Sequence, residues 1–217
     1  MKLAICTPTT GTVRIEWTES LINVVKNVLR DPYNKITDVK LFFFCSSVIP
    51  KNRNNIVNHA LKWGATHLLF IDDDMRFPVE VFKAIWKQRD LPIIAANCIK
   101  RKYPIEYMGT GWDDKEVSST GKEGLEEVRF TGFSYIMITR EVCEKIPKPW
   151  FAFPYMKELD DYGTEDYFFM SLAHLHGFPT VVYHDISQLI QHIGAHVFDP
   201  LSQRGQVIDQ EVPDSPD

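Results

Sequence analysis

The first hundred residues alternate two kinds of segment, and this alternation constrains the fold more than any other feature. Short, mostly apolar runs occur at residues 3–6, 39–45, 68–71 and 93–97. Between them, apolar residues recur every three or four positions, which is the spacing of one helix face. Apolar strands that alternate with amphipathic helices are typical of a parallel sheet covered on both faces. We therefore predict an α/β fold with a mostly parallel sheet flanked by helices.

The second half of the chain is less regular. Residues 103–125 are polar and contain glycine, which favours a loop or a short hairpin. The other expected elements are strands at 128–130, 135–139 and 180–183, and a helix at 164–176 that Gly177 would end. A chain of 217 residues suits one core. We expect one domain over residues 1–205 and an acidic, proline-containing tail over residues 206–217.

Charge and composition limit the kinds of partner and the location that we expect for this chain. The net charge of −5 disfavours nucleic acid, and the short basic run Lys100-Arg101-Lys102 is interpreted as a solvated loop. The apolar runs are far shorter than the roughly 20 residues of a membrane helix, and no signal-peptide core follows Met1. The four cysteines are scattered without CxxC spacing, which is typical of a reduced protein. We therefore expect a cytoplasmic protein without a membrane span.

The expected topology indicates where the chemistry lies. In an open parallel sheet, ligands bind beyond the carboxyl ends of the strands. That rule selects residues 7–11, 72–74 and 97–100, each of which follows an apolar run. All three segments are expected to face the same side of the molecule.

Asp72-Asp73-Asp74 is the sharpest chemical signal in these segments. Three adjacent carboxylates repel one another unless a cation or a proton relieves the repulsion. Oxygen ligands suit Mg²⁺ or Mn²⁺, which keep open positions for phosphate oxygens. The alternative is a solvated acidic turn that caps the next helix. The position of the triplet directly after an apolar strand favours the metal site.

A second signal is the acidic pair Glu165-Asp166, which follows Gly163-Thr164 at the start of an expected helix. Thr164 can cap this helix, and acids in its first turn favour the helix dipole, so a structural role explains the pair. The functional interpretation is that one carboxylate is a general base that takes a proton from an acceptor hydroxyl.

The remaining candidates have equally plain structural alternatives. His192 and His196 lie astride Gly194 and are either metal ligands or structural histidines. Arg53 either reaches a phosphate or lies on the surface. The aromatic residues at 150–153 pack against a sugar or against one another.

Taken in order, these residues resemble a glycosyltransferase of the GT-A fold, which is a Rossmann-like architecture. The chain is most similar to the small, single-domain, family-2-like enzymes of large viruses, phages and bacteria. The resemblance runs from Leu3 to about His196. It rests on Thr7-Pro8-Thr9, Arg53-Asn54, the DxD-type Asp72-Asp73-Asp74, Thr131-Gly132-Phe133, Glu165-Asp166, and His192 with Gly194.

The resemblance implies a role for each motif. Thr7, Pro8 and Thr9 would contact the nucleoside, and Arg53 would lie near the nucleotide. Asp72 would lie near the ribose or the metal, and Asp73 would share this donor-binding turn, because the triplet leaves the register of DxD open. The metal ligands would be Asp74 and His192, with His196 competing for the second position. Glu165 or Asp166 would face the acceptor, and residues 131–133 with Trp150 would shape its pocket.

The implied reaction moves a sugar from a nucleotide-diphosphate sugar, UDP-linked or less favourably GDP-linked, to a hydroxyl acceptor such as a glycan, with Mn²⁺ or Mg²⁺ as cofactor. Either stereochemical outcome fits. One alternative is a nucleotidyltransferase, which should carry a glycine-rich basic loop after the first strand, whereas residues 7–12 hold one glycine. The others are a non-catalytic nucleotide- or carbohydrate-binding module and a glycosyltransferase acting on hydroxylated DNA bases.

Overall fold

A computed structural model describes residues 1–158, 160–194, 196–198 and 206–207, with only the backbone described for residues 29, 196–198 and 206–207. Seven strands form the central sheet in the order β2-β1-β3-β7-β5-β10-β6. They are β1 (Lys2–Thr9), β2 (Asp38–Cys45), β3 (His67–Ile71), β5 (Ile93–Ala95), β6 (Leu125–Val128), β7 (Tyr135–Thr139) and β10 (Thr180–Tyr183). β7 runs antiparallel to β3 and β5, and β6 runs antiparallel to β10. The other five strands point the same way, so their carboxyl ends meet at one edge of the sheet.

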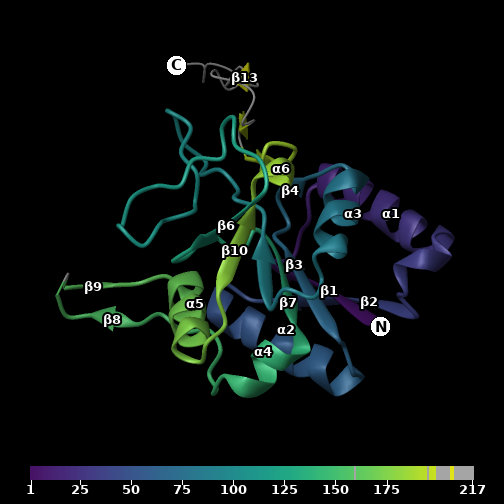
Figure 1. Cartoon of the computed structure of the whole chain (residues 1–217), viewed down its shortest axis with the longest axis horizontal. Coiled ribbons are helices and arrows are strands. Elements are labelled where there is room, and N and C mark those ends of the chain that lie inside the picture. Colours follow the sequence, from purple (N-terminus) through teal and green to yellow (C-terminus); the bar gives the residue numbers. More distant parts are fainter. Residues whose placement is uncertain (159, 195, 199–205, 208–217) are drawn as a thin grey trace, which may run out of the picture.

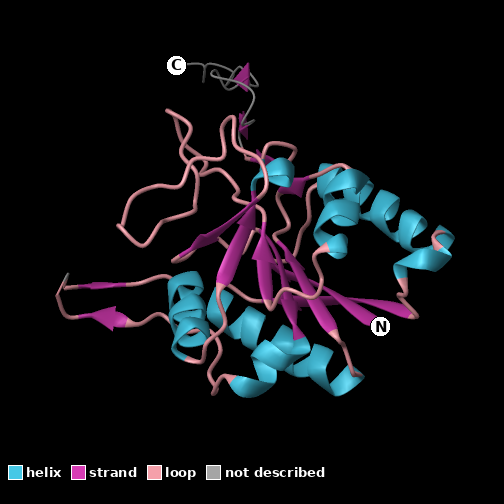
Figure 2. Cartoon of the chain, viewed as in Figure 1, coloured by secondary structure: helices cyan, strands magenta, loops and turns pink. Residues whose placement is uncertain are grey.

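Helices cover both faces of this sheet (Figures 1 and 2). On one face, α1 (Ile15–Arg30), α3 (Val79–Lys87) and the short α6 (His184–Ser187) enclose a core that includes Trp17 and Phe82. On the other, α2 (Ile49–Trp63), α4 (Arg140–Lys145) and α5 (Glu165–Leu175) enclose a core that includes Phe133 and Phe169. The 3₁₀ helix η1 (Pro32–Asn34) follows α1. The structure is therefore a mixed α/β fold with two apolar layers.

The helix ends follow the local sequence. Gly64 ends α2 with φ at 89°, a left-handed conformation that favours glycine. The hydroxyl of Thr164 caps α5 by accepting a hydrogen bond from the amide of Tyr167 at 3.3 Å. The cap fixes the first turn of α5, where Glu165 and Asp166 lie.

Two smaller sheets flank the edge where the parallel strands end. One has the order β13-β12-β11-β4, formed by β13 (Gln206–Val207), β12 (His196–Phe198), β11 (Gln191–Ile193) and β4 (Met75–Arg76). The other is a hairpin of β8 (Tyr155–Met156) and β9 (Asp161–Tyr162), which projects beside α5 (Figure 1). Because β4 follows Asp74 and pairs with β11, it brings His192 next to the acidic triplet.

The predicted α/β class and the mostly parallel sheet are confirmed, with three differences. The segment at 39–45 is not a buried strand, because β2 is an edge strand in which Leu41 and Phe43 are 39% and 47% exposed. The strand expected at 128–130 ends at Val128. β7 enters the sheet antiparallel, which apolar runs alone do not reveal, because they carry no strand direction.

The tail expected at residues 206–217 lies outside the described part of the chain, except for Gln206–Val207. In the described part, no helix combines the length and the apolar character that crossing a bilayer requires.

Candidate functional site

A cavity of about 430 Å³ lies where the parallel strands end. Its walls come from the loop after β1, the acidic turn after β3, the segment after β5, the first turns of α2 and α5, and β11. The lining includes Pro8, Thr9, Arg53, Asp72, Asp73, Asp74, Arg101, Glu165, Asp166 and His192. Two of the three segments selected by the strand-end rule thus meet in one cavity, whereas residues 97–100 do not line it and the adjacent Arg101 does.

The backbone of the acidic turn is held by three distant segments. The amide of Asp72 donates to the carbonyl of Ser134 at 3.1 Å, at the entry to β7. The carbonyl of Asp73 accepts from Arg14 at 3.0 Å, and the carbonyl of Asp74 accepts from Ile193 at 2.8 Å. The position of the turn therefore does not depend on its three carboxylates.

Asp74 and His192 form a close pair in this cavity, with Oδ2 and Nε2 at 3.2 Å. Nδ1 of His192 lies 2.9 Å from the carbonyl of Ile99 and must donate to it, because a carbonyl only accepts. In the neutral ring, Nε2 therefore turns its lone pair toward a carboxylate oxygen. Burial lowers the pKa of His192, but the hydrogen bond and charge of Asp74 and the Ile99 carbonyl outweigh it and raise the pKa.

The same oxygen of Asp74 also contacts Arg101, whose Nη1 lies at 3.0 Å. Burial acts to raise the pKa of Asp74, but the hydrogen bond and charge of His192 and the charge of Arg101 hold that pKa below its ordinary value. Asp73 differs, because burial, and then the charges of Asp74 and Asp72, outweigh a hydrogen bond from Thr9 and raise its pKa. Asp74 is thus held ionised more strongly than Asp73.

The Asp74 and His192 pair fits a divalent cation. Two ligands bound at about 2.1 Å and at a right angle lie about 3 Å apart, close to the observed 3.2 Å. Metal-binding histidines usually donate their other ring N–H to a backbone carbonyl or a carboxylate, as His192 does. In the described part of the chain, no three His, Cys, Asp or Glu side chains form a ready metal cluster. Further ligands would therefore have to come from solvent or from a bound substrate.

Arg53 links the acidic turn to the start of α5. It is only 2% exposed, and its Nη2 lies 3.2 Å from Oδ1 of Asp72, while its Nε lies 3.3 Å from Oε1 of Glu165. Oδ1 of Asp166 lies 3.9 Å from the same Nη2. The guanidinium also lies over the Phe133 ring, 5.0 Å from its centroid. Burial opposes the charge of Arg53, but Asp72, Asp166 and Glu165 outweigh it and raise the pKa of Arg53.

Asp166 is the carboxylate best placed to accept a proton. Burial raises its pKa to about 7, together with the charges of Glu165 and Asp72 and against the charge of Arg53. Its Oδ2 accepts from the amide of Phe133 at 3.4 Å, whereas its Oδ1 has no hydrogen-bond partner among the described residues. Glu165, by contrast, is engaged by Arg53. The Asp166 side chain is 23% exposed and that of Glu165 is 9% exposed, so Asp166 is the more accessible of the two carboxylates proposed as base, although its Oδ1 is itself buried.

The other predicted residues are divided between cavity and core. Pro8 and Thr9 line the cavity, but Thr7 is 1% exposed and does not. Trp150, 2% exposed, donates through Nε1 to the carbonyl of Cys143 and belongs to the core rather than to an acceptor pocket. The side chain of His196 lies outside the described part of the chain.

Arg101 is the site residue that sequence reasoning missed. The run Lys100-Arg101-Lys102 is not simply a solvated loop, because its middle residue lines the cavity while both lysines pair with Glu106. The sequence signal for Arg101 was its position just after the fourth apolar run, near the segments that the strand-end rule selects.

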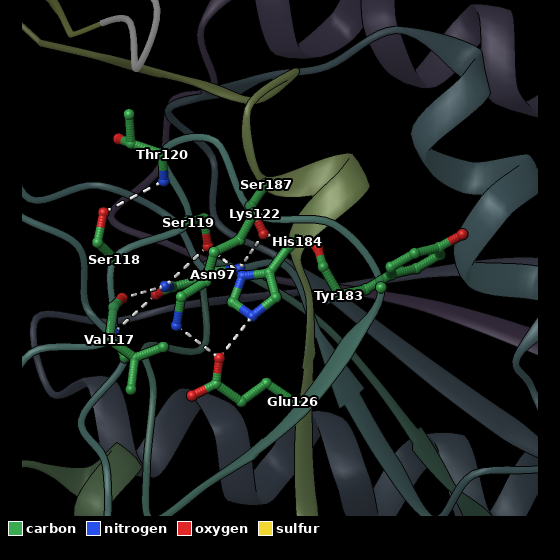
Figure 3. Close-up of polar contacts among 12 residues, drawn as sticks. Asn97, Val117, Ser118, Ser119, Thr120, Lys122, Glu126, Tyr183, His184 and Ser187 are labelled. Carbon is green, nitrogen blue, oxygen red and sulfur yellow. Dashed lines mark hydrogen bonds and ion pairs between the residues drawn. The ribbon is translucent and has the colours of Figure 1, made fainter.

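Asn97, which the strand-end rule also selected, has a structural role instead (Figure 3). Its Nδ2 donates to the hydroxyl of Ser119 at 3.0 Å, and that hydroxyl lies 2.8 Å from Nδ1 of His184. Nε2 of His184 lies 2.9 Å from Oε2 of Glu126. The Ser, His and Glu types suggest a nucleophile with its base, but Ser119 is fully buried, so its hydroxyl is closed to a substrate. Asn97 also accepts from the amide of Gly109 at 2.7 Å, where a Cβ atom would lie 2.8 Å from Oδ1.

The arrangement defines a mixed α/β protein with a polar cavity at its strand ends, and a known structure shares this fold. No protein-family model and no curated protein matches the chain by sequence. The crystal structure of A197 from STIV is similar, with a TM-score of 0.62 and 18% sequence identity over 95% of this chain and 94% of that one. S. aureus TarS residues 1–349 in complex with UDP-GlcNAc gives a TM-score of 0.48 and 17% identity over 85% of this chain. This chain covers 56% of that one.

Proposed function

We propose that this chain is a metal-dependent glycosyltransferase that takes its sugar from a nucleoside diphosphate sugar. One observation carries the proposal. A single cavity holds Asp74 and His192, spaced as two metal ligands, and also Asp166, a partly buried carboxylate whose pKa is raised to about 7. Transfer of a sugar to a hydroxyl needs both parts, because a diphosphate must leave and a proton must be removed.

The proposed roles follow from the contacts. Asp74 and His192 would hold Mn²⁺ or Mg²⁺, whose charge stabilises the leaving diphosphate. Pro8 and Thr9 form the part of the cavity wall assigned to the nucleoside. Arg53 neutralises Asp72 and Glu165 and keeps the start of α5 against the acidic turn. Asp166 takes the proton of the acceptor hydroxyl while that oxygen attacks the anomeric carbon.

The finer parts of the proposal rest on the sequence resemblance. They are a UDP-linked rather than a GDP-linked donor, a glycan as acceptor, a family-2-like type and a cytoplasmic location. A direct displacement by the acceptor oxygen inverts the anomeric configuration, and a retaining outcome would require a different path for the sugar.

The test is calorimetric titration of the full chain with UDP and with GDP, each with Mn²⁺ and with EDTA. We expect one nucleotide to bind with micromolar affinity in Mn²⁺ and to lose that binding in EDTA. Folded protein that binds neither nucleotide would overturn the proposal. With the nucleotide known, a panel of its sugar donors read by NMR gives the sugar and the configuration of the product.

A further inference from the structure

Arg101 and His192 compete for one atom of the cavity. Nη1 of Arg101 lies 3.0 Å from Oδ2 of Asp74, and Nε2 of His192 lies 3.2 Å from the same oxygen. A divalent cation bound between Asp74 and His192 would take this oxygen. Because two cations repel each other at one oxygen, the guanidinium of Arg101 has to leave when such a cation binds.

The loop that carries Arg101 allows this movement without rearranging its backbone. Ile99 pairs with Tyr107, and the amide of Lys100 donates to the carbonyl of Glu106 at 2.8 Å. Lys100 and Lys102 both pair with the carboxylate of Glu106. The side chain of Arg101, in contrast, is 55% exposed. Because this side chain is open to solvent, the guanidinium can turn while the loop stays in place.

Electrostatics indicate where the guanidinium turns. Five carboxylates line the cavity, namely Asp72, Asp73, Asp74, Glu165 and Asp166. A nucleoside diphosphate is itself strongly negative, so its binding needs positive charge beside the metal. Among the described residues lining the cavity, Arg53 and Arg101 are the permanent cations, and Arg53 is buried and already paired with carboxylates. Arg101 is therefore the permanent cation still available to a phosphate.

We propose that Arg101 is a diphosphate ligand that exchanges partners. In the free protein it neutralises Asp74, and once a divalent cation has taken Asp74 and His192 it turns to the phosphate oxygens next to the sugar. Its planar fork of N–H donors suits two oxygens of one phosphate. The inference rests on the proposed function and adds a specificity-determining residue that distinguishes a diphosphate from a monophosphate.

The experiment compares the full-length wild-type protein with Arg101→Gln and with Lys102→Gln as the matched control. The two variants remove the same charge from adjacent exposed positions, but Lys102 faces Glu106 rather than the cavity. Each protein is titrated calorimetrically with Mn²⁺ alone, and then with UDP, GDP and UMP at saturating Mn²⁺. Thermal unfolding verifies that all three are equally folded.

We expect Arg101→Gln to bind Mn²⁺ alone at least as tightly as the wild type, because Asp74 is released from its ion pair. Its affinity for the diphosphate should fall 10- to 100-fold, with less than a threefold change for UMP and no change in Lys102→Gln. The diphosphate affinity of Arg101→Lys should lie between those of the wild type and Arg101→Gln, since lysine keeps the charge but lacks the planar fork of N–H donors.

An unchanged diphosphate affinity in Arg101→Gln, or an equal loss for UMP and UDP, would overturn the inference alone. A wild-type protein that binds neither UDP nor GDP in Mn²⁺ would overturn the proposed function and this inference with it. A loss of Mn²⁺ binding in Arg101→Gln would show that Arg101 supports the metal ligands instead of competing with the metal.

Discussion

Nε2 of His192 faces Oδ2 of Asp74 at 3.2 Å, and the other nitrogen of the ring donates to the carbonyl of Ile99. The Ile99 contact fixes the ring so that Nε2 cannot turn away from Asp74. We therefore predict that Asp74→Ala and His192→Ala each weaken Mn²⁺-dependent binding of the nucleoside diphosphate at least 100-fold. Calorimetry in Mn²⁺ and in EDTA measures this loss.

The fold should survive both changes, since the acidic turn is held by its backbone bonds to Arg14, Ser134 and Ile193. Circular dichroism and thermal unfolding are the controls. If either variant keeps a metal-dependent affinity within threefold of the wild type, its side chain is not a metal ligand.

Asp166→Asn is predicted to lower kcat by about 10²–10⁴-fold, the usual contribution of a general base. The donor Kd should change less than threefold, because proton removal matters only in the transition state. The matched variant is Glu165→Gln, whose amide oxygen can still accept from Arg53, so its kcat should fall less than tenfold. Equal losses of kcat and donor affinity in Asp166→Asn would indicate a structural role in the first turn of α5.

The raised pKa of Asp166 predicts the pH dependence of turnover. Burial, with Glu165 and Asp72, raises this pKa to about 7, and the base must be ionised to accept a proton. At saturating substrates, kcat should rise about tenfold per pH unit below pH 7 and level off above it. The same profile measured on the residual activity of Asp166→Asn should lack that step; a step that persists belongs to another group.

Raising the pH through 7 should lower the contribution of Asp166 to stability, although it should raise turnover. The pKa of Asp166 is higher in the folded protein than in the unfolded chain. At a pH between these two pKa values, the folded state therefore holds a proton that the unfolded state has lost. The contribution of Asp166 to the free energy of unfolding is therefore present at low pH and is lost as the pH rises through 7. Urea unfolding at pH 5 and pH 8 should show Asp166→Asn gaining stability relative to the wild type at the higher pH.

Arg53→Met should destabilise the fold by about 3–5 kcal/mol at pH 7, because it leaves buried carboxylates without their counter-charge. Arg53 is 2% exposed and contacts Asp72 and Glu165 directly. The control is Lys115→Met, which breaks an ion pair whose lysine is 81% exposed and should change stability by less than about 0.5 kcal/mol. Urea denaturation measures both, and comparable losses would contradict the role given to Arg53.

Ser119→Ala is predicted to destabilise the fold by about 1–3 kcal/mol, because buried Asn97 and His184 each lose a hydrogen-bond partner. The adjacent Ser118 is exposed, and Ser118→Ala should be close to neutral. If the two variants unfold at the same urea concentration, the network of Figure 3 does not stabilise the protein.

The sequence predicted the elements of the fold better than their pairing. Apolar runs and helical periodicity located β1, β3, β5 and the helices α1, α2, α3 and α5, because burial alone sets those patterns; the short α4 and α6 were not predicted. They could not reveal that β7 lies between β3 and β5, since strand order depends on how the whole sheet packs. The exposure of Leu41 and Phe43 was missed for the same reason, because an edge strand can be as apolar as a central one.

In the candidate site, too, some residues could be named from the sequence and others only from the structure. Asp74 and His192 could be named from the sequence, and the structure brings their side chains together. Arg101 was missed, because its place after the fourth apolar run brings the basic run near the site but does not indicate which of its three residues turns inward. Asp166 and Glu165 are adjacent and chemically alike, and only the structure reveals that Glu165 is hydrogen-bonded to Arg53 while Asp166 has the more exposed side chain.

The three backbone bonds that hold the acidic turn also set the order in which the site can be completed during protein synthesis. Asp74 leaves the ribosome well before Ser134, and Ser134 well before His192 and Ile193. Until the last of these emerges, the carboxylates have neither their histidine partner nor their full backbone support. A nascent chain thus completes this cavity late in translation, after most of the sheet is available to fold.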